Sequence, residues 1–195
     1  HTNHTMKIIL ASGSPRRKEL LSGLDVDFEV RLHPGIDESY PADLPVQEIA
    51  RYIACRKSYA YRETISDGEI LLTADTIVVV GDKVLGKPAD AREACRMLRL
   101  LSGRTHQVMT GVCLATKEHE RSFSVETDVT FKELSEGEIR YYVEHYKPFD
   151  KAGAYGIQEW IGYIGVESIK GSYFNVMGLP VQRIYSELAA FQHSR

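Results

Sequence analysis

The segment Ile70–Val80 constrains the fold more than any other, because it is the most apolar run in the chain and carries one charge, Asp75, in its middle. A continuous apolar run bounded by turn residues is typical of a strand that is buried on both faces of a sheet. We therefore predict a central strand interrupted by Asp75. Gly81-Asp82 is expected to turn it into a short antiparallel partner, Lys83–Leu85.

Asp75 is the first candidate for chemistry. An ionised carboxylate within an apolar strand carries a large desolvation cost unless a positive partner meets it, and a divalent cation is such a partner. The dipeptide Asp75-Thr76 also suits the position where open α/β sheets place catalytic groups, in the crevice beyond the strand ends. The alternative is that Asp75 pairs with a core arginine or caps a turn, without a catalytic role.

A second constraint lies near the N-terminus, where an apolar strand pattern, Ile8–Leu10, precedes the polar turn Ser12-Gly13-Ser14. Pro15 suits the first position of a helix and Ser14 suits its N-cap, so the pattern predicts a strand, a tight loop and a helix. The N-terminus of such a helix offers unpaired N–H groups and a positive dipole end, which together favour a bound phosphate.

Arg16 and Arg17 support that interpretation. The helix dipole disfavours cations at a helix start, so two arginines in the first turn make sense when an anion normally lies among them. The alternative is an ordinary capped helix with two solvated arginines.

Strand and helix patterns alternate along the rest of the chain, which predicts an α/β fold with a mixed, twisted sheet flanked by helices. The expected elements are an edge strand over 28–31, a helix over 45–61, a helix over 90–101 capped by Asp90, long strands over 105–116 and 121–131, a helix over 135–146 opened by a capping box at Ser135, and a last helix from Pro180. The segments 148–158 and 171–180 are expected to be loops.

Glu38, in the turn-rich segment 34–41, becomes a metal candidate when it is paired with Asp75. One or two carboxylates, several waters and substrate phosphate oxygens are a common site for magnesium or manganese. Lys57, Lys87 and Arg17 would supply three cations for a triphosphate with about four negative charges, and so stabilise a departing pyrophosphate. Each lysine taken alone is better explained as surface charge than as a ligand.

The segment Asp150–Gln158 combines a charged opening, glycines that permit close backbone approach and a terminal amide. The Gln158 amide can donate and accept hydrogen bonds at once, which suits the edge of a nucleotide base. A structural glutamine that binds loop carbonyls is the alternative. The segment Gly171–Pro180 is expected to wall the same site, although Tyr173 and Phe174 suit the core equally well.

The composition excludes several classes of function. A chain of 195 residues with 43% hydrophobic and 26% charged residues is typical of a globular protein, and a net charge of −3 argues against a nucleic-acid polymer as partner. No apolar run reaches the roughly 20 residues that span a bilayer, so we expect no membrane partner and a cytoplasmic location. Residues 1–5 have the character of a tag remnant, which leaves residues 6–195 as a single domain.

The cysteines and histidines suggest no further site. Three cysteines that are far apart, without a CxxC pair, favour buried free thiols over a disulfide framework or a zinc knuckle: Cys55, Cys95 and Cys113. The histidines after the tag region lack metal-ligand spacing. The sequence leaves open whether the chain forms a homodimer.

Six motifs together resemble the Maf family of nucleotide pyrophosphatases, in that family's order and over nearly the whole chain from Met6. They are Leu10–Arg17, Thr73–Thr76, Gly86–Pro88, Ser102–His106, Asp150–Gln158 and Gly178–Pro180. The resemblance implies two lobes with a cleft between them, as in inosine triphosphate pyrophosphatases. It also implies hydrolysis of nucleoside triphosphates to the monophosphate and pyrophosphate with a divalent metal, Mg²⁺ or Mn²⁺.

Roles follow from the resemblance position by position. Asp75 matches the general base and Glu38 a metal-associated acid, while the residues around the phosphates match Ser12, Ser14, Arg17, Lys57 and Lys87. Arg16, Thr76 and Gln158 resemble the branch that hydrolyses dTTP and UTP, whereas tryptophan in place of Arg16 marks a branch that prefers modified guanine nucleotides.

The chain departs from the family pattern at Glu159-Trp160-Ile161, where small residues are usual, and this change is expected to narrow the base pocket or alter loop mobility. Ser58 stands where alanine is usual and leaves the role of Lys57 intact. The sequence therefore predicts a dTTP and UTP pyrophosphatase that cleans the nucleotide pool. The alternatives are a pyrophosphatase for modified or noncanonical purine nucleotides and a nucleotide-binding regulator of septum formation.

Overall fold

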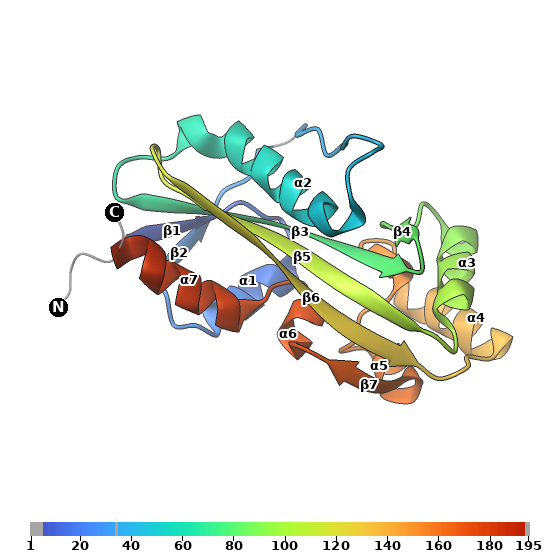
Figure 1. Ribbon diagram of the computed structural model, residues 1–195. Helices are drawn as coiled ribbons and strands as arrows, with labels where there is room; N and C mark the ends of the chain where they lie inside the picture. The colour runs from blue at the N-terminus through green and yellow to red at the C-terminus, as the bar shows by residue number, and fades with distance from the viewer. Residues whose placement is uncertain (1–5, 34, 194–195) are drawn as a thin grey trace. The chain divides into compact units, whose positions relative to one another are not determined.

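Seven strands in the described part of the chain form one sheet, which helices flank (Figure 1). The computed structural model describes residues 6–33 and 35–193. The expected tag remnant at residues 1–5 lies outside the described residues, as does Pro34 of the turn-rich segment.

The sheet mixes parallel and antiparallel pairs, as the sequence predicts. Its strands are β1 (Lys7–Leu10), β2 (Phe28–Val30), β3 (Glu69–Val80), β4 (Lys83–Leu85), β5 (Thr105–Ala115), β6 (Glu120–Phe131) and β7 (Val166–Lys170). The order is β2-β1-β3-β5-β6-β7, and β4 pairs with β3. β1 is parallel to β2 and β3, whereas β4 is antiparallel to β3 and β7 is antiparallel to β6. The predicted edge position of β2 and the hairpin of β3 with β4 are confirmed.

Local capping chemistry fixes where several helices begin. The helices are α1 (Pro15–Ser22), α2 (Val46–Tyr61), α3 (Ala91–Leu101), α4 (Glu136–Tyr146), α5 (Trp160–Gly165), α6 (Tyr173–Met177) and α7 (Val181–His193), with 3-10 turns η1 (Arg62–Thr64) and η2 (Ala152–Ala154). The predicted caps of α1 by Ser14, of α3 by Asp90 and of α4 by the Ser135 capping box are all present. Within the described residues, none of these helices has the length and apolar character needed to cross a bilayer.

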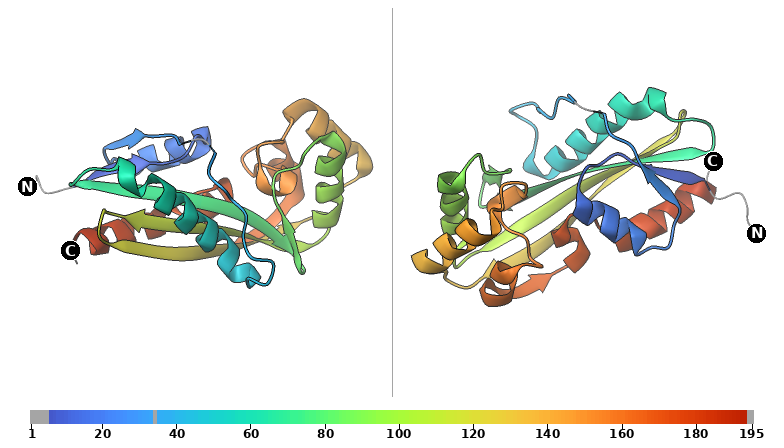
Figure 2. Two further views of the ribbon diagram at one scale, coloured as in Figure 1. Left: turned by 90° about the horizontal axis from the view of Figure 1, so that it is seen from above. Right: turned by 180° about the vertical axis from the view of Figure 1, so that it is seen from behind.

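Two compact units divide the chain. One unit comprises the described parts of 1–75, 110–125 and 178–195. In this unit α2 covers one face of the sheet, while α1 and α7 cover the other, as both views in Figure 2 agree. A buried cluster joins side chains from three strands, Ile9, Leu71 and Ala115, to Tyr61 at the end of α2.

The second unit comprises 76–109 and 126–177. Here α3 and α4 pack beside each other. The core of this unit gathers Leu98 from α3, Tyr142 from α4 and Phe131 from β6, each at most 1% exposed. Burial of such side chains supplies the main favourable term in folding.

Two predictions about secondary-structure elements were wrong, and two short elements were missed. β3 is one continuous strand of 12 residues, so Asp75 does not interrupt it. The expected loop over 148–158 is irregular apart from the three-residue turn η2, whereas the expected loop over 171–180 contains α6. The sequence pattern also did not predict α5 and β7. Helices of six and five residues are too short to display an apolar stripe, so tertiary packing decides them. Tyr173 and Phe174 on α6 are 39% and 48% exposed, so neither belongs to the core.

Candidate active site

Asp75 lies on β3 between the segment that pairs with β1 and the segment that pairs with β4. β1 pairs with residues 69–72 of this strand and β4 with residues 78–80, so Asp75 falls outside both ladders. Its side chain is 15% exposed, with Ala74 buried beside it in the strand. The carboxylate therefore projects from a buried strand at a place where neither of these partner strands pairs with the backbone.

Lys57 on α2 is the close cationic partner of Asp75. Its ammonium group donates hydrogen bonds to the Ala74 carbonyl oxygen at 3.1 Å and to Asp75 Oδ1 at 3.3 Å. Glu38 Oε2 lies 3.7 Å from the same nitrogen. The hydrogen-bonded cation at Asp75 is thus a lysine, not the core arginine of the alternative interpretation. The same ammonium group lies close to both predicted carboxylates, Asp75 and Glu38.

The electrostatics of Asp75 follow from this environment. Burial raises the pKa of Asp75 above its ordinary value, while the positive charges of Lys57 and Arg17 oppose that rise and the Glu38 carboxylate adds to it. A carboxylate whose pKa is raised is a stronger proton acceptor when ionised than a solvated one. Asp75 is therefore suited to general-base chemistry.

Arg17 is held at the first turn of α1 by the backbone before α7. Its Nε donates to the Gly178 carbonyl oxygen at 2.8 Å. Burial lowers the pKa of Arg17, and the charges of Asp75 and Glu38 oppose this shift, so the guanidinium stays cationic. A fixed, permanent positive charge at a helix start is suited to a phosphate group.

The loop before α1 is stabilised by its own serines. Ser14 Oγ accepts a hydrogen bond from Arg17 N at 3.3 Å, and Ser14 N donates to Ser12 Oγ at 3.2 Å. The Ser14 side chain is thus the helix cap, as predicted, and Ser12 in turn holds the Ser14 backbone. A phosphate contact by either serine remains a prediction.

Asp75 and Glu38 fit the divalent cation that the sequence predicts. Both are hard oxygen donors, and both approach a common point that already carries the Lys57 ammonium. Glu38 is 58% exposed, which leaves its carboxylate free to adjust to an ion that retains waters and binds substrate phosphates. The donor chemistry suits Mg²⁺ or Mn²⁺ better than a softer metal.

Of the other predicted residues, Thr76, Lys87 and Gln158 belong to the second unit, and Arg16 lies on α1 in the first. Thr76 follows Asp75 on β3 and is partly buried, Lys87 is exposed after β4, and Arg16 is partly buried on α1. The Lys87 turn is held to the 150–158 segment, because Gly153 N donates to the Gly86 carbonyl oxygen at 3.1 Å. Gly153 has φ +72°, and a Cβ there would press on Val78 at 2.8 Å, so its close approach is to the protein core.

Gln158 presents a buried acceptor to which no residue in the described part of the chain donates a hydrogen bond. Its Oε1 is inaccessible to solvent and accepts no hydrogen bond from the described residues. A buried amide oxygen left unsatisfied costs about 1–3 kcal/mol, so the position gains if a ligand supplies a donor. This observation favours the base-edge interpretation of Gln158 over the interpretation in which its amide satisfies loop carbonyls.

In the segment 159–161, where the chain departs from the family pattern, Glu159 makes its contacts with other parts of the protein. Glu159 Oε1 accepts from the Tyr142 hydroxyl at 2.5 Å, and Tyr142 Oη accepts from Gly156 N at 3.0 Å. Lys151, part of the charged opening, is only 9% exposed and lies 3.6 Å from Glu159 Oε2. These groups hold the segment against α4, and whether they narrow a base pocket stays a prediction.

Sequence reasoning missed Gly178 as the anchor of Arg17. The available signal was the motif Gly178–Pro180, which ends a glycine-containing segment just before the last helix. Gly178 has φ +124°, a conformation that L side chains rarely adopt. Its carbonyl direction therefore depends on glycine at that position.

Comparisons with known proteins found similar chains. A protein described as "dTTP/UTP pyrophosphatase" from Bacteroides thetaiotaomicron is 62% identical over 182 residues, which are 93% of this chain and 94% of that protein. One with the same description from Phocaeicola vulgatus is 63% identical over equal shares. A solved structure described as a HAM1 protein from Coxiella burnetii matches at 13% identity with a TM-score of 0.48, over 95% of this chain and 99% of that chain.

A family model described as "Maf-like protein" matches residues 7–191, which covers both compact units and every predicted site residue. The resemblance seen in the six sequence motifs is therefore confirmed. This chain belongs to the Maf family.

Proposed function

We propose that this protein hydrolyses dTTP and UTP to the nucleoside monophosphate and pyrophosphate. The observation that carries the proposal is the convergence of the Lys57 ammonium on Asp75 at 3.3 Å and Glu38 at 3.7 Å. The relatives described as dTTP/UTP pyrophosphatases, at 62% and 63% identity, support the choice of substrates. Residues 6–195 act as one functional domain in this proposal, and we propose the cytoplasm, which holds the nucleotide pool, as the location of the activity.

The reaction would begin with proton removal from water by Asp75. The water oxygen forms a bond to the α-phosphorus, the bond from that phosphorus to the bridging oxygen of the β-phosphate breaks, and pyrophosphate leaves. The proton passes to Asp75 Oδ, whose pKa burial raises. Lys57 orients this carboxylate through its hydrogen bond and offers its positive charge to the phosphates.

Charge on the departing pyrophosphate would be met by Arg17 and Lys87, with Ser12 and Ser14 holding the loop at the start of α1. Arg17 suits this role because the Gly178 carbonyl fixes its guanidinium and its charge is permanent. Lys87 is exposed on a turn that Gly153 holds, so its side chain can reach a polyanion.

A divalent cation, Mg²⁺ or Mn²⁺, would be held by Asp75 and Glu38. When bound, it would neutralise phosphate charge and polarise the α-phosphate toward attack. Lys57 already shares both carboxylates, so cation binding and the Lys57 ion pair compete for the same oxygens.

Specificity for a pyrimidine base would rest on Arg16, Thr76 and Gln158. The unsatisfied Oε1 of Gln158 supports a contact with an N–H donor, and the amide nitrogen can donate to a neighbouring carbonyl. Uracil and thymine present an N–H flanked by carbonyl oxygens, which matches this amide.

A substrate panel with Mg²⁺ and with Mn²⁺ tests the proposal, with product analysis that separates pyrophosphate from orthophosphate. We expect metal-dependent release of pyrophosphate, fastest with dTTP and UTP. Faster turnover of modified purine nucleotides would transfer the activity to the rival substrate class. Nucleotide binding without turnover above a metal-free blank would favour a regulator, such as one acting in septum formation.

A further inference from the structure

Two cysteines that are far apart in the sequence meet where α2 packs on β5. Gly111 makes this contact tight, because a Cβ at that position would overlap the backbone of Arg51 on α2. Cys55 follows Arg51 by one helical turn, and Cys113 follows Gly111 on the same face of the strand. The backbone approach at Gly111 therefore brings the two thiols together within one compact unit.

The third member of the group is Glu120, at the start of β6. One ligand atom each from Cys55, Cys113 and Glu120 lies within 4.8 Å of the other two. Hydroxyl groups flank the two thiols, with Ser122 beside Cys55 and Ser58 beside Cys113.

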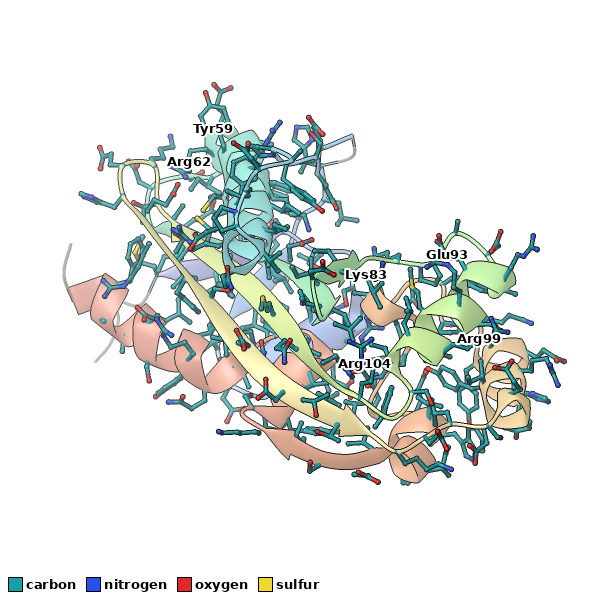
Figure 3. All side chains as sticks on the ribbon, turned by 45° about the vertical axis from the view of Figure 1, so that its right-hand side comes forward. Tyr59, Arg62, Lys83, Glu93, Arg99 and Arg104 are labelled. Atoms are coloured by element: carbon teal, nitrogen blue, oxygen red, sulfur yellow. The ribbon has the colours of Figure 1, made fainter. Side chains whose placement is uncertain are left out.

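Glu120 is already oriented by a cation. Arg62 Nη2 donates to Glu120 Oε1 at 2.6 Å. Arg62 is the first residue of η1, directly after α2 (Figure 3). The Glu120 side chain is 42% exposed, whereas Cys113 is 0% exposed. The group thus has a buried end at Cys113 and an open end at the Glu120 carboxylate, through which an ion can enter.

The donor set suits a borderline-soft divalent cation. Two thiolates and one carboxylate are common ligands of Zn²⁺, with Zn–S near 2.3 Å and Zn–O near 2.1 Å, so the ligand atoms of a tetrahedral site lie about 3.5–3.8 Å apart. The present separations, within 4.8 Å, require only side-chain adjustment of about 1 Å to reach that geometry. Water would complete the tetrahedron at the exposed side.

The charge balance also favours binding. Two thiols give up two protons to solvent when a doubly charged cation binds, so the net charge of the group stays unchanged. The Arg62–Glu120 pair persists, because a carboxylate has a second oxygen for the metal. The absence of a CxxC pattern concealed the site in the sequence, since its ligands come from one helix and two strands.

We propose that Cys55, Cys113 and Glu120 form a binding site for one Zn²⁺-class cation that clamps α2 to the β5–β6 hairpin. Cys55 precedes Lys57 on α2 by two positions, so the clamp would stabilise the helix that carries Lys57. The site is separate in its residues from Asp75 and Glu38, and the proposal does not depend on the pyrophosphatase activity.

Anaerobic titration of the reduced, metal-free full-length protein with Co²⁺ tests the site. We expect one equivalent to produce sulfur-to-cobalt charge-transfer absorption, which equimolar Zn²⁺ removes and which Mg²⁺ does not produce. Cys55→Ser and Cys113→Ser should each abolish the band, and Glu120→Gln should weaken Co²⁺ binding by at least about 10- to 100-fold. Cys95→Ser is the matched control, because Cys95 lies in the second unit, and it should leave the band unchanged.

Thiol counting gives a second readout that does not need a variant to fold. Cys55 and Cys95 are partly exposed, whereas Cys113 is buried. Zn²⁺ should therefore protect Cys55 from an aromatic disulfide reagent and leave Cys95 reactive, while Mg²⁺ protects neither. A band that survives in Cys55→Ser, or equal reactivity of Cys55 and Cys95 in the presence of Zn²⁺, would overturn the proposal. Loss of two thiols on peroxide treatment together with no Co²⁺ band would identify the pair as a redox-active dithiol instead of a metal site.

Discussion

Lys57 Nζ lies 3.3 Å from Asp75 Oδ1 and 3.1 Å from the Ala74 carbonyl oxygen. One ammonium group therefore binds both a side chain and the backbone of β3 in the candidate active site. Both side chains are 15% exposed. Their coupling is therefore less screened by solvent than that of a surface ion pair. The Lys57 ammonium therefore limits the negative charge that Asp75 presents to a substrate, and the Asp75 carboxylate limits the positive charge that Lys57 presents.

Asp75→Asn should retain nucleotide binding and lose turnover. Asparagine preserves the shape of the side chain but cannot accept the proton, so we expect the turnover rate to fall by about 10²–10⁴-fold. Pyrophosphate release and calorimetric binding of dTTP measure the two effects separately. Asp82→Asn, at the exposed β3–β4 turn, is the matched control and should change neither. An unaffected rate in Asp75→Asn would remove Asp75 from the proposed role.

Lys57→Met should couple to Asp75→Asn in a double-mutant cycle. Removal of the ammonium leaves the Asp75 carboxylate without its nearest cation, so the pKa of Asp75 should rise further and the protein should lose stability. We expect an interaction energy of about 0.5–3 kcal/mol for the pair in urea denaturation. Lys83→Met on β4 serves as control because Lys83 is exposed. Strictly additive effects would mean that the 3.3 Å contact carries no energy.

Gln158→Leu should lower activity without lowering stability. Its Oε1 has no hydrogen-bond partner among the described residues, so leucine removes an unsatisfied buried acceptor and the free energy of unfolding should stay equal or increase. If the amide contacts the base, kcat/KM for dTTP and UTP should fall by about 10- to 100-fold.

Gln107→Leu is the contrasting variant for Gln158. Gln107 Nε2 donates to Asp128 Oδ1 at 3.3 Å, so its loss should cost stability and leave kcat/KM unchanged. The reverse pattern, in which Gln158→Leu destabilises the fold and spares activity, would assign Gln158 to structure alone.

The sequence predicts the residue types of the candidate site better than their arrangement. A carboxylate in the apolar run of β3 needs a nearby cation, and this requirement follows from the local sequence alone. Which cation meets it depends on how α2 lies on the sheet, and that is set by the backbone contact at Gly111. Lys57 could thus be named as a candidate, but its hold on both Asp75 and Glu38 could not be predicted.

In the second unit, α5 and β7 could not be predicted because they also depend on contacts that are distant in sequence. α5 and β7 are short and follow a segment rich in glycine, so local pattern carries little information there. Contacts that are distant in sequence stabilise this region, such as the Tyr142 hydroxyl with Glu159 and with Gly156 N. The strongly capped helices α3 and α4 were predicted accurately because their signals are local.

His106 should make stability depend on pH in a defined window. It is fully buried, its Nε2 contacts the Tyr155 hydroxyl at 2.5 Å, and burial lowers its pKa from 6.5 to about 4 although Asp128 opposes the shift. Below pH 6.5 the unfolded chain binds a proton that the folded protein does not, so stability falls as the pH falls from 6.5 toward about 4. The loss attributable to His106 should be on the order of 3 kcal/mol.

Urea denaturation across that window measures the effect of His106. His106→Gln should reduce the pH dependence by up to one proton, whereas His119→Gln, at an exposed turn, should leave it unchanged. Equal pH slopes in His106→Gln and the parent protein would show that another group governs the transition.

Gly111→Ala should be among the most destabilising single substitutions in the chain. An added Cβ would overlap the backbone atoms of Arg51 and Ala50, and a backbone cannot move aside as a flexible side chain can. We expect a loss of about 3 kcal/mol or more in the free energy of unfolding. Gly86→Ala is the matched control, because a Cβ there meets nothing within 4 Å and should leave stability nearly unchanged. The contact at Gly111 positions the helix that carries Lys57, so the folded fraction of Gly111→Ala should also show reduced turnover. Normal turnover per folded molecule would mean that Lys57 is positioned independently of this contact.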